Sequence, residues 1–329
     1  MKELKARVDN KNPLISVIMP NYCQGQYIGE AIQSVLLQTY QKLELIIIDN
    51  YSTDDTVAVV ESFTDPRIRF FQFHNQGVIA RSRNYGVQLA RGEVIAFLDS
   101  DDIWNLDKLA IQIPLLYQSE VAAVTSTFDP IGEVQYASDY IHGKNKLAGL
   151  YQRFSFQDLI EKNRVITSSL MMQKKYFDDL QGFDESEVFA FYEDWELWLR
   201  VVHAWGDVVC YTAKPLVQYR IGKKKNRDQR RVALVSLTIA KKLLDQKVLT
   251  LQQYNTLCER HYFSIGMAHL EVGDRGARHY FLQSLQKSAK WQDRCKACLG
   301  LVLSIFPKSW ITRLLPQLYN GRYMLRKIC

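Results

Sequence analysis

The sequence predicts an α/β fold, with a mainly parallel sheet that carries helices on both faces, followed by a helical C-terminal region. Short apolar runs alternate with helical patterns over the first hundred residues, as they do in parallel sheets covered by helices. These apolar runs are continuous rather than alternating, which is typical of strands buried on both faces. After residue 221 the periodicity is helical almost throughout.

Each element of the first hundred residues has a local justification. The expected strands are apolar runs, and the first of them ends at a proline. The second helix opens with Ser, Thr and Asp, which favour a helix N-terminus, and the third closes at a glycine. Strands are expected at 14–20, 43–49, 68–73 and 93–99, and helices at 26–38, 52–63 and 77–92.

The pattern is less regular in the next hundred residues. The segment 129–150 is polar and poorly periodic, so it is expected to be a surface excursion. A strongly amphipathic helix is followed by what reads as the last strand of the domain. Helices are expected at 105–118 and 193–206, and strands at 121–128, 168–173 and 207–212.

The chain is expected to have three parts: an N-terminal extension (1–12), an α/β domain (13–221) and a basic helical region (222–329). The net charge of +7 is unevenly distributed. Residues 1–220 contain 21 Lys and Arg against 29 Asp and Glu, whereas residues 221–329 contain 21 against 6. An acidic first part and a basic second part suggest different partners for each.

No targeting or membrane-spanning segment is expected. The N-terminus is charged and lacks an apolar core, and no apolar run reaches the roughly 18 residues of a transmembrane helix. The six cysteines are scattered, and the single C-x-x-C, Cys295 and Cys298, has no second pair to complete a zinc site. We interpret them as helix-face thiols, which fits a reducing, cytoplasmic location.

Three of the expected strands end in polar residues. The carboxyl ends of parallel strands meet at one edge of a sheet, which is where open α/β sheets bind ligands. The side chains after these strands should therefore gather at one rim. They are Asn21 and Tyr22 after the first strand, Asp49 after the second, and Asp99, Ser100, Asp101 and Asp102 after the fourth.

The acidic segment has two interpretations from its spacing alone. Asp99 and Asp101, two positions apart, could bind Mg²⁺ or Mn²⁺, because hard divalent cations prefer carboxylate oxygens. Alternatively the carboxylates cap the helix that follows, a role that suits Asp102. The sequence has neither the G-x-G-x-x-G of dinucleotide-binding proteins nor the G-x-x-x-x-G-K-[ST] of P-loop proteins. Any phosphate binding would therefore depend on carboxylates and a metal ion.

Four segments in order carry a resemblance to a known family. They read SVIMPNYCQGQYIGEAIQSVLLQTY, LELIIIDNYSTDDT, GVIARSRNYGVQLARGEVIAFLDSDDIW and FYEDWELWLR. Together they resemble glycosyltransferase family 2, the inverting nucleotide-sugar transferases of GT-A fold. The resemblance covers about residues 13–220 and implies the same fold and class of activity.

The resemblance implies a nucleotide-sugar pocket at the rim. Tyr22 would lie against the base, although a core tyrosine is the alternative. Asp49 would accept a hydrogen bond from the base, which suits uracil. Arg83 would lie near the nucleotide, unless it is a solvated helix arginine. The residues of the pocket would be Pro20, Asn21, Tyr22, Asp49, Arg83, Asp99 and Ser100.

The resemblance also implies a metal end and a base end. Asp101 would be the principal ligand of a divalent cation, with Asp99 on the ribose or the metal. Asp194 would take the proton from the acceptor hydroxyl, as inverting transfer requires, with Glu193 as the second candidate. Read without the family, Asp194 is a helix N-cap. Trp104 and Trp195 are expected either to stack on sugar rings or to belong to the core.

Two departures from the family pattern bear on details. Asn50 and Tyr51 stand where many relatives have Asp and Gly. After the segment VQYR many relatives have a metal-binding His, whereas this chain continues with Ile221, Gly222 and lysines, which are either a charge for the diphosphate or a solvated linker. The Q-x-x-R-W signature of processive synthases is absent, so single addition is expected.

The sequence therefore predicts a metal-dependent inverting glycosyltransferase with a nucleotide-diphosphate sugar donor, UDP-sugar first, and a glycan or lipid-linked acceptor of cell-surface polysaccharide synthesis. A nucleotidyltransferase and a non-catalytic nucleotide-sugar-binding module are the alternatives. The basic region suggests peripheral attachment to an anionic membrane on the inner face, or else a solvated helical bundle. Nucleic acid is not expected as a partner.

Overall fold

The chain folds as two compact units, Met1–Lys224 and Lys225–Cys329. The domain boundary expected between residues 221 and 222 stays a prediction. The computed structural model describes residues 12–118, 121–133, 150–161, 163–189, 192–222, 229–274 and 276–306, with the side chains of 161, 229 and 231 left out.

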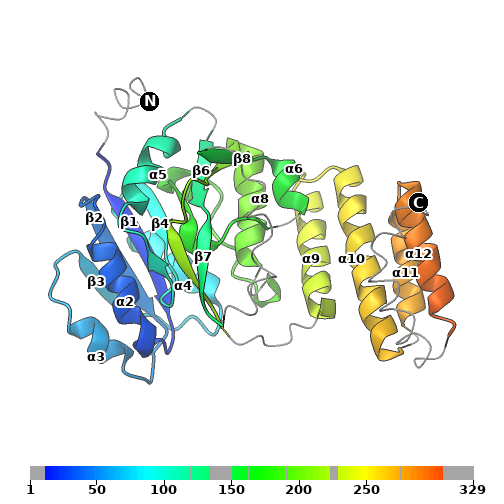
Figure 1. Ribbon diagram of the computed structural model, residues 1–329, viewed down its shortest axis with the longest axis horizontal. Coiled ribbons are helices and arrows are strands. Elements are labelled where there is room, and N and C mark those ends of the chain that lie inside the picture. The colour runs from blue at the N-terminus through cyan, green and yellow to red at the C-terminus, as the bar shows by residue number, and fades with distance from the viewer. Residues whose placement is uncertain are drawn as a thin grey trace. The chain divides into compact units, whose positions relative to one another are not determined.

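An eight-stranded mixed sheet forms the centre of the first unit (Figure 1), and the α/β prediction is confirmed. The strand order is β3-β2-β1-β4-β9-β6-β10-β8. Strands β3, β2, β1 and β4 are parallel, β9 is antiparallel to both its neighbours, and β8 is antiparallel to β10. The strands are β1 (Ile15–Asn21), β2 (Leu43–Asp49), β3 (Ile68–Gln72), β4 (Val94–Phe97), β6 (Val121–Ser126), β8 (Tyr151–Phe154), β9 (Met171–Gln173) and β10 (Asp207–Tyr211).

Helices cover both faces of the sheet because its strands are apolar on both sides. Met19 of β1 packs in one core with Ile28 of α2 and Leu109 of α5. On the other face Phe97 of β4 contacts Phe177 of α7 and Phe183, and α4 packs on β1 and β2. The helices of this unit are α2 (Gly25–Leu36), α3 (Thr56–Glu61), α4 (Ile79–Leu89), α5 (Lys108–Leu116), α6 (Phe156–Glu161), α7 (Lys174–Asp179) and α8 (Glu193–Trp205).

A second, three-stranded sheet lies outside the predicted pattern. Its order is β5-β11-β7. The prediction that 207–212 is the last strand of the domain is wrong, because another strand follows it and pairs with chain far away in sequence. The expected helix at 105–118 begins three residues later than predicted. The strands of this sheet are β5 (Ile103–Trp104), β7 (Phe128–Gly132) and β11 (Val217–Ile221).

Two 3₁₀ turns connect elements of the first unit. The turn η2 covers Thr167–Ser169, inside the stretch predicted as a strand at 168–173, and η3 covers Glu187–Phe189. Part of the predicted surface excursion is strand β7, and most of the rest, residues 134–149, lies outside the described residues.

The second unit is helical, as its periodicity predicts. The expected pair of helices around a Gly-Asp turn is confirmed, with Gly273 in the left-handed region at φ 76°, where glycine carries no Cβ penalty. Phe281 is buried at the centre of this unit. None of the helices in the described stretches is both long and apolar enough for a membrane span. The described part of this unit contains the helices α9 (Gln229–Asp245), α10 (Leu251–Val272), α11 (Ala277–Lys287) and α12 (Trp291–Leu303).

Candidate active site

The carboxyl ends of β1 and β2 are held together by a buried polar cluster. Asn21 is paired with Asp49 in the strand register and donates to its Oδ1 at 2.9 Å. The backbone N–H of Ser52 donates to Asp49 Oδ2 at 2.9 Å, and the Ser52 hydroxyl donates to Oδ1. Asp49 is fully buried. Its carboxylate therefore holds the ends of β1 and β2 and the chain at Ser52 together. Its hydrogen bond to a base stays a prediction.

Two exposed tyrosines stand at this rim. Tyr22 is 59% exposed and Tyr51 is 54% exposed, whereas Pro20 is buried. Tyr51 meets His74 edge-on, with ring centroids 6.2 Å apart. Both Cys23 and Tyr51 have positive φ, at 50° and 53°, a conformation that costs a non-glycine residue energy and occurs often at functional sites. The core alternative for Tyr22 is thereby excluded, and its ring face is accessible to a ligand.

The acidic segment follows β4 directly. The backbone N–H of Asp99 donates to the Ser168 hydroxyl at 3.0 Å, which fixes where the segment turns. The Asp99 side chain is 29% exposed, and Ser100 is buried. Desolvation, together with the charge of Asp99, raises the pKa of Asp101 to about 6. Two carboxylates therefore lie close enough here to repel each other.

Asp102 has a structural role that the sequence did not indicate. It is 1% exposed and accepts hydrogen bonds from the Ser168 hydroxyl at 2.5 Å and the Arg220 backbone N–H at 2.7 Å. The prediction that Asp102 caps the following helix is wrong, because α5 begins only at Lys108. Burial and the neighbouring carboxylates raise the pKa of Asp102 well above its usual value.

Arg220 is a cation at the rim that sequence reasoning missed. It lies at the end of VQYR, one residue before the expected position of a metal-binding His. Its guanidinium donates to the backbone oxygen of Asp101 at 2.8 Å and lies over the ring of Tyr27, 4.0 Å from the centroid. Only the pairing of β11 with β5 and β7 brings it here, so no local signal could have identified it.

Asp194 occupies the second position of α8 and is not its N-cap, which is Tyr192. It accepts hydrogen bonds from Asn163 at 3.2 Å, from Thr167 at 3.3 Å and from the Trp195 backbone N–H at 2.6 Å. Desolvation and the charge of Glu193 raise the pKa of Asp194 to about 7, against the opposing charge of Arg83. A carboxylate with this pKa can accept a proton near neutral pH.

The turn η2 joins the two acidic ends of the site, which are the segment Asp99–Asp102 after β4 and Asp194 at the start of α8. Its Ser168 hydroxyl binds the acidic segment at Asp99 and Asp102, and its Thr167 hydroxyl binds Asp194. The fold thus brings together an acidic segment and an aspartate that are more than 90 positions apart in the chain, as the resemblance requires.

Arg83 is buried between these ends rather than solvated. It donates to Glu193 Oε1 at 2.7 Å and to Asp99 Oδ1 at 2.8 Å, and its guanidinium lies 5.6 Å from the centroid of the Phe183 ring. The solvated-arginine alternative is therefore excluded. Its contact with a nucleotide stays a prediction.

The two tryptophans belong to the core, so the prediction that they stack on sugar rings is wrong. Trp104 is 3% exposed, donates its indole N–H to the Ser168 carbonyl at 2.7 Å, and has the ammonium of Lys108 over its ring. Trp195 is 5% exposed and donates to the Leu159 carbonyl at 2.7 Å. Neither ring has a free face for a ligand.

The acidic segment fits a divalent cation that is shared with phosphate. Within the described ranges no three His, Cys, Asp or Glu residues gather as a complete metal site. Asp99 and Asp101 offer carboxylates whose mutual repulsion raises the pKa of Asp101. Mg²⁺ typically takes one or two carboxylates and fills its other positions with water and phosphate oxygens, which matches this incomplete set.

The site thus consists of an acidic segment after β4 at the carboxyl edge of an α/β sheet, joined through η2 to Asp194 at the start of α8. The model of the family described as glycosyl transferase family 2 matches residues 16–180. The chain belongs to this family and is a glycosyltransferase.

Named relatives agree with this assignment. The Escherichia coli UDP-Glc:alpha-D-GlcNAc-diphosphoundecaprenol beta-1,3-glucosyltransferase WfgD is 29% identical over 192 residues, 57% of this chain and 70% of WfgD. A putative teichuronic acid biosynthesis glycosyltransferase of Bacillus subtilis, TuaG, is 37% identical over 115 residues, 34% of this chain and 46% of TuaG. A Rickettsia felis glycosyltransferase is 34% identical over 158 residues, but the match spans only 25% of that protein.

Solved structures share the GT-A fold. Staphylococcus aureus TarS 1–349 in complex with UDP has a TM-score of 0.59 at 16% identity, covering 87% of this chain and 88% of that one. The mannosyltransferase PcManGT of Pyrobaculum calidifontis, in complex with GDP-Man and Mn²⁺, has a TM-score of 0.56 at 16% identity, covering 92% and 88%. At this identity the likeness shows the fold alone.

Proposed function

We propose that the protein is a metal-dependent, inverting glycosyltransferase that transfers one sugar from a nucleotide-diphosphate donor to an acceptor hydroxyl. A UDP-sugar is the first candidate donor, because WfgD is named for UDP-Glc and TarS binds UDP. The acceptor is a glycan or lipid-linked saccharide of cell-surface polysaccharide synthesis, by analogy with WfgD and TuaG.

The observation that carries the proposal is the pair of acidic ends joined by η2. At one end, Asp101 and Asp99 would hold Mg²⁺ or Mn²⁺. Such a cation, when bound, neutralises the charge that builds up on a departing diphosphate. Arg220 donates to the backbone oxygen of Asp101, and it supplies a fixed positive charge one residue before the position where many relatives have a His.

At the other end Asp194 acts as the base. Its pKa of about 7 leaves a large ionised fraction near neutral pH, while keeping the carboxylate basic enough to remove a proton from a hydroxyl. Glu193 is engaged by Arg83 through Oε1, so it is the second candidate. Tyr22 presents an open ring face to the base of the donor.

Two alternatives have less support. A nucleotidyltransferase usually has a Gly-rich, basic loop after the first strand, and the segment after β1 reads NYCQGQYIGE. A non-catalytic binding module need not keep both acidic ends, and both are kept.

A donor screen tests the proposal. The full-length protein is incubated with UDP-, GDP- and dTDP-sugars and Mn²⁺ or Mg²⁺, and nucleotide release is measured with and without lipid extracts. We expect metal-dependent release with one donor, and its loss in Asp101→Ala. Asp107→Ala is the matched control, because Asp107 is a partly exposed aspartate whose ion pair is with the surface residue Lys214. Tight UDP binding with no release under any condition would favour a non-catalytic module.

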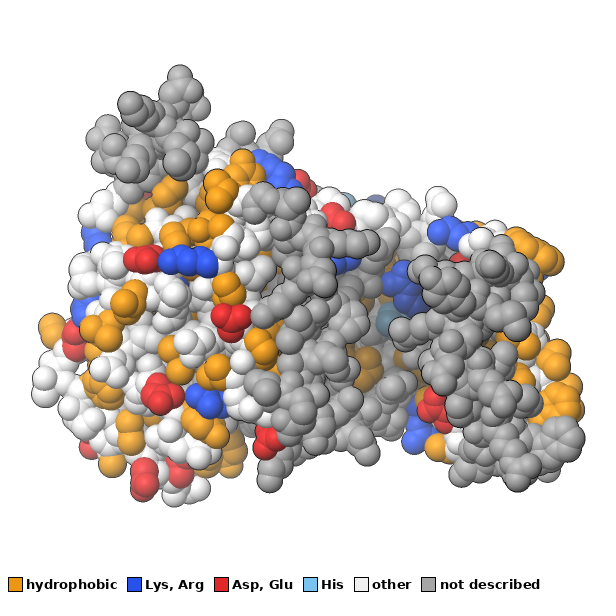
Figure 2. All heavy atoms as spheres, in the orientation of Figure 1, with side chains coloured by type: hydrophobic (Ala, Val, Ile, Leu, Met, Phe, Trp, Pro, Cys, Tyr) orange, Lys and Arg blue, Asp and Glu red, His pale blue; other side chains and the backbone are white. Residues whose placement is uncertain are grey.

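The second unit is proposed to attach the enzyme to the inner face of the cytoplasmic membrane. Figure 2 shows hydrophobic side chains gathered over α12. Trp291 is 73% exposed and Val302 is 52% exposed, and helical spacing puts them on one side of α12. Ile305, just after the helix, is 66% exposed. Arg294 and Lys296 lie on the same helix and are exposed. A basic amphipathic helix of this kind suits anionic headgroups.

A further inference from the structure

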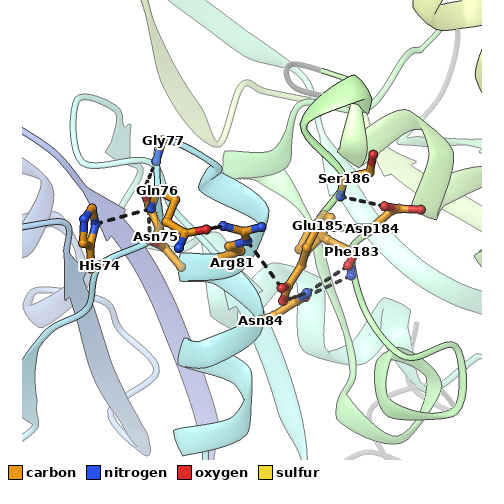
Figure 3. Close-up of polar contacts among 11 residues, drawn as sticks. His74, Asn75, Gln76, Gly77, Arg81, Asn84, Phe183, Asp184, Glu185 and Ser186 are labelled. Atoms are coloured by element: carbon orange, nitrogen blue, oxygen red, sulfur yellow. Dashed lines mark hydrogen bonds and ion pairs between the residues drawn. The ribbon is translucent and has the colours of Figure 1, made fainter.

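The segment from Phe183 to Ser186 is clamped to α4. The Asn84 side chain donates to the Phe183 carbonyl at 2.8 Å and to Glu185 Oε1 at 2.9 Å, and it accepts from the Phe183 backbone N–H at 3.0 Å (Figure 3). Arg81 of the same helix pairs with Glu185 at 3.7 Å. The chain just before α8 is therefore fixed against α4, so that side chains of α4 can meet the start of α8.

Arg83 uses this arrangement to bridge the two acidic ends. Its side chain is 4% exposed and forms two charge-assisted hydrogen bonds, one to Glu193 beside the base and one to Asp99 at the metal end. Charge-assisted bonds are short and directional. One guanidinium with planar, fixed geometry thus sets how far the start of α8 lies from the end of β4.

From this bridge we infer that Arg83 is a positioning residue of the transfer reaction. It fixes the distance between Asp194 and Asp99 and is not a ligand of the nucleotide. The inference rests on the proposed function, in which these carboxylates are the base end and the metal end. Each terminal nitrogen of Arg83 already donates to a carboxylate, and the buried Nε has no partner among the described residues.

Arg83 also acts on Asp194 through its charge. Besides desolvation, the charge of Glu193 raises the pKa of Asp194. The pKa is lowered by Arg83, by the Trp195 N–H and by Asn163, and the Thr167 hydroxyl also donates to the Asp194 carboxylate. Arg83 is the one cation in this set. Without it the ionised base becomes less favourable, so its protonation should extend to higher pH.

The test compares Arg83→Met with Arg83→Lys and with Arg200→Met. Arg200 is the matched control, because it is also a buried arginine paired with a glutamate, Glu196, but it binds the carbonyls of Leu180 and Gly182 instead of the site. The readouts are kcat with the donor found by the screen, the affinity for UDP with saturating Mn²⁺, and the pH–rate profile.

For Arg83→Met we expect kcat to fall about 10- to 100-fold, since small misplacements of reacting groups cost this much. UDP affinity should stay within about threefold, and the acid limb of the pH–rate profile should move to higher pH. Arg83→Lys keeps the charge and should restore the position of that limb. A tenfold loss of UDP affinity with kcat retained would show a nucleotide ligand instead, and an equal loss of kcat in Arg200→Met would show only general packing.

A second measurement separates this inference from the proposed function. Thermal unfolding of Arg83→Met, Glu193→Gln and the double variant forms a cycle that needs no activity. The bridge predicts that the double variant unfolds at a higher temperature than the two single shifts together imply. Additive shifts would overturn the bridge even in an active enzyme. If wild type releases nucleotide from no donor, the proposed function fails, and the cycle alone decides whether Arg83 is coupled to Glu193 at the start of α8.

Discussion

At the scale of single residues, Asp194 is the proposed base of the transfer reaction. Its environment combines desolvation and the neighbouring Glu193, which raise its pKa to about 7, with hydrogen bonds that keep the ionised form accessible. The proposed reaction divides metal binding and proton transfer between different carboxylates. Arg220 lies beside Asp101, whereas Arg83 pairs with Asp99 and also lowers the pKa of Asp194 through its charge.

Changing Asp194 to Asn should reduce transfer by about a hundredfold or more, the usual scale for a general base, with UDP affinity unchanged. The wild-type kcat should rise as pH rises through about 7, because only the ionised carboxylate accepts a proton and its pKa is about 7. The variant should lose this limb. Initial rates between pH 5 and 9 measure both effects. Asp158→Asn is a control, since Asp158 lies in the same unit and its carboxylate accepts hydrogen bonds from the backbone and side chain of Ser155. A variant with normal rates would leave Asp194 with a purely structural role.

At the scale of elements, the sequence predicts what is local. The four parallel strands β1 to β4 and the helices between them follow from apolar runs and helix signals, and the register of β1 with β2 places Asn21 beside Asp49. Strands β5 and β11 were missed because their pairing partners are distant in the chain. Periodicity likewise could not decide whether Trp104 faces the core or a ligand.

The residues of the candidate site likewise fall into those that the sequence predicted and those that it did not. Asp101 and Asp194 were identified by their motifs, and the structure brings the segments that carry them to one turn. Thr167 and Ser168 were missed, because a Ser or Thr in a short turn has no signature that distinguishes it from any other loop residue. Arg220 was missed because only the pairing of β11 with distant strands brings it to the rim. Their roles come from contacts made by folding alone.

The turn η2 gives a prediction at this scale. Ser168→Ala removes the hydroxyl that binds the Asp99 N–H and the buried Asp102 carboxylate, so it should cost roughly 1–3 kcal/mol of unfolding free energy and also weaken Mn²⁺-dependent activity several-fold. Ser169→Ala is the matched control. Ser169 is buried in the same turn, but its hydroxyl contacts Thr125 and the Ile166 carbonyl. Both variants should be less stable than wild type in urea unfolding, while only Ser168→Ala should need more Mn²⁺ for half-maximal rate.

At the scale of the whole molecule, the two units have opposite charge. The first 220 residues are acidic in balance and the remainder strongly basic, with 21 Lys and Arg against 6 Asp and Glu. The catalytic residues proposed here all lie in the first unit, so the basic helices are free for another task. If the acceptor is lipid-linked, a surface that binds anionic lipid raises the local concentration of that acceptor.

Vesicle pelleting tests this assignment of the second unit. The full-length protein should pellet with vesicles of anionic phosphatidylglycerol and much less with neutral phosphatidylcholine, because headgroup charge attracts Lys and Arg. Raising the salt from 0.05 to 0.5 M, roughly, should weaken pelleting through screening. Val302→Ser on the exposed side of α12 should reduce binding further, whereas Leu251→Ser, an equally exposed apolar site at the start of α10, should not. Pelleting that is absent, or that ignores both salt and lipid charge, would leave the basic helices as a solvated bundle and direct the search for their partner to proteins.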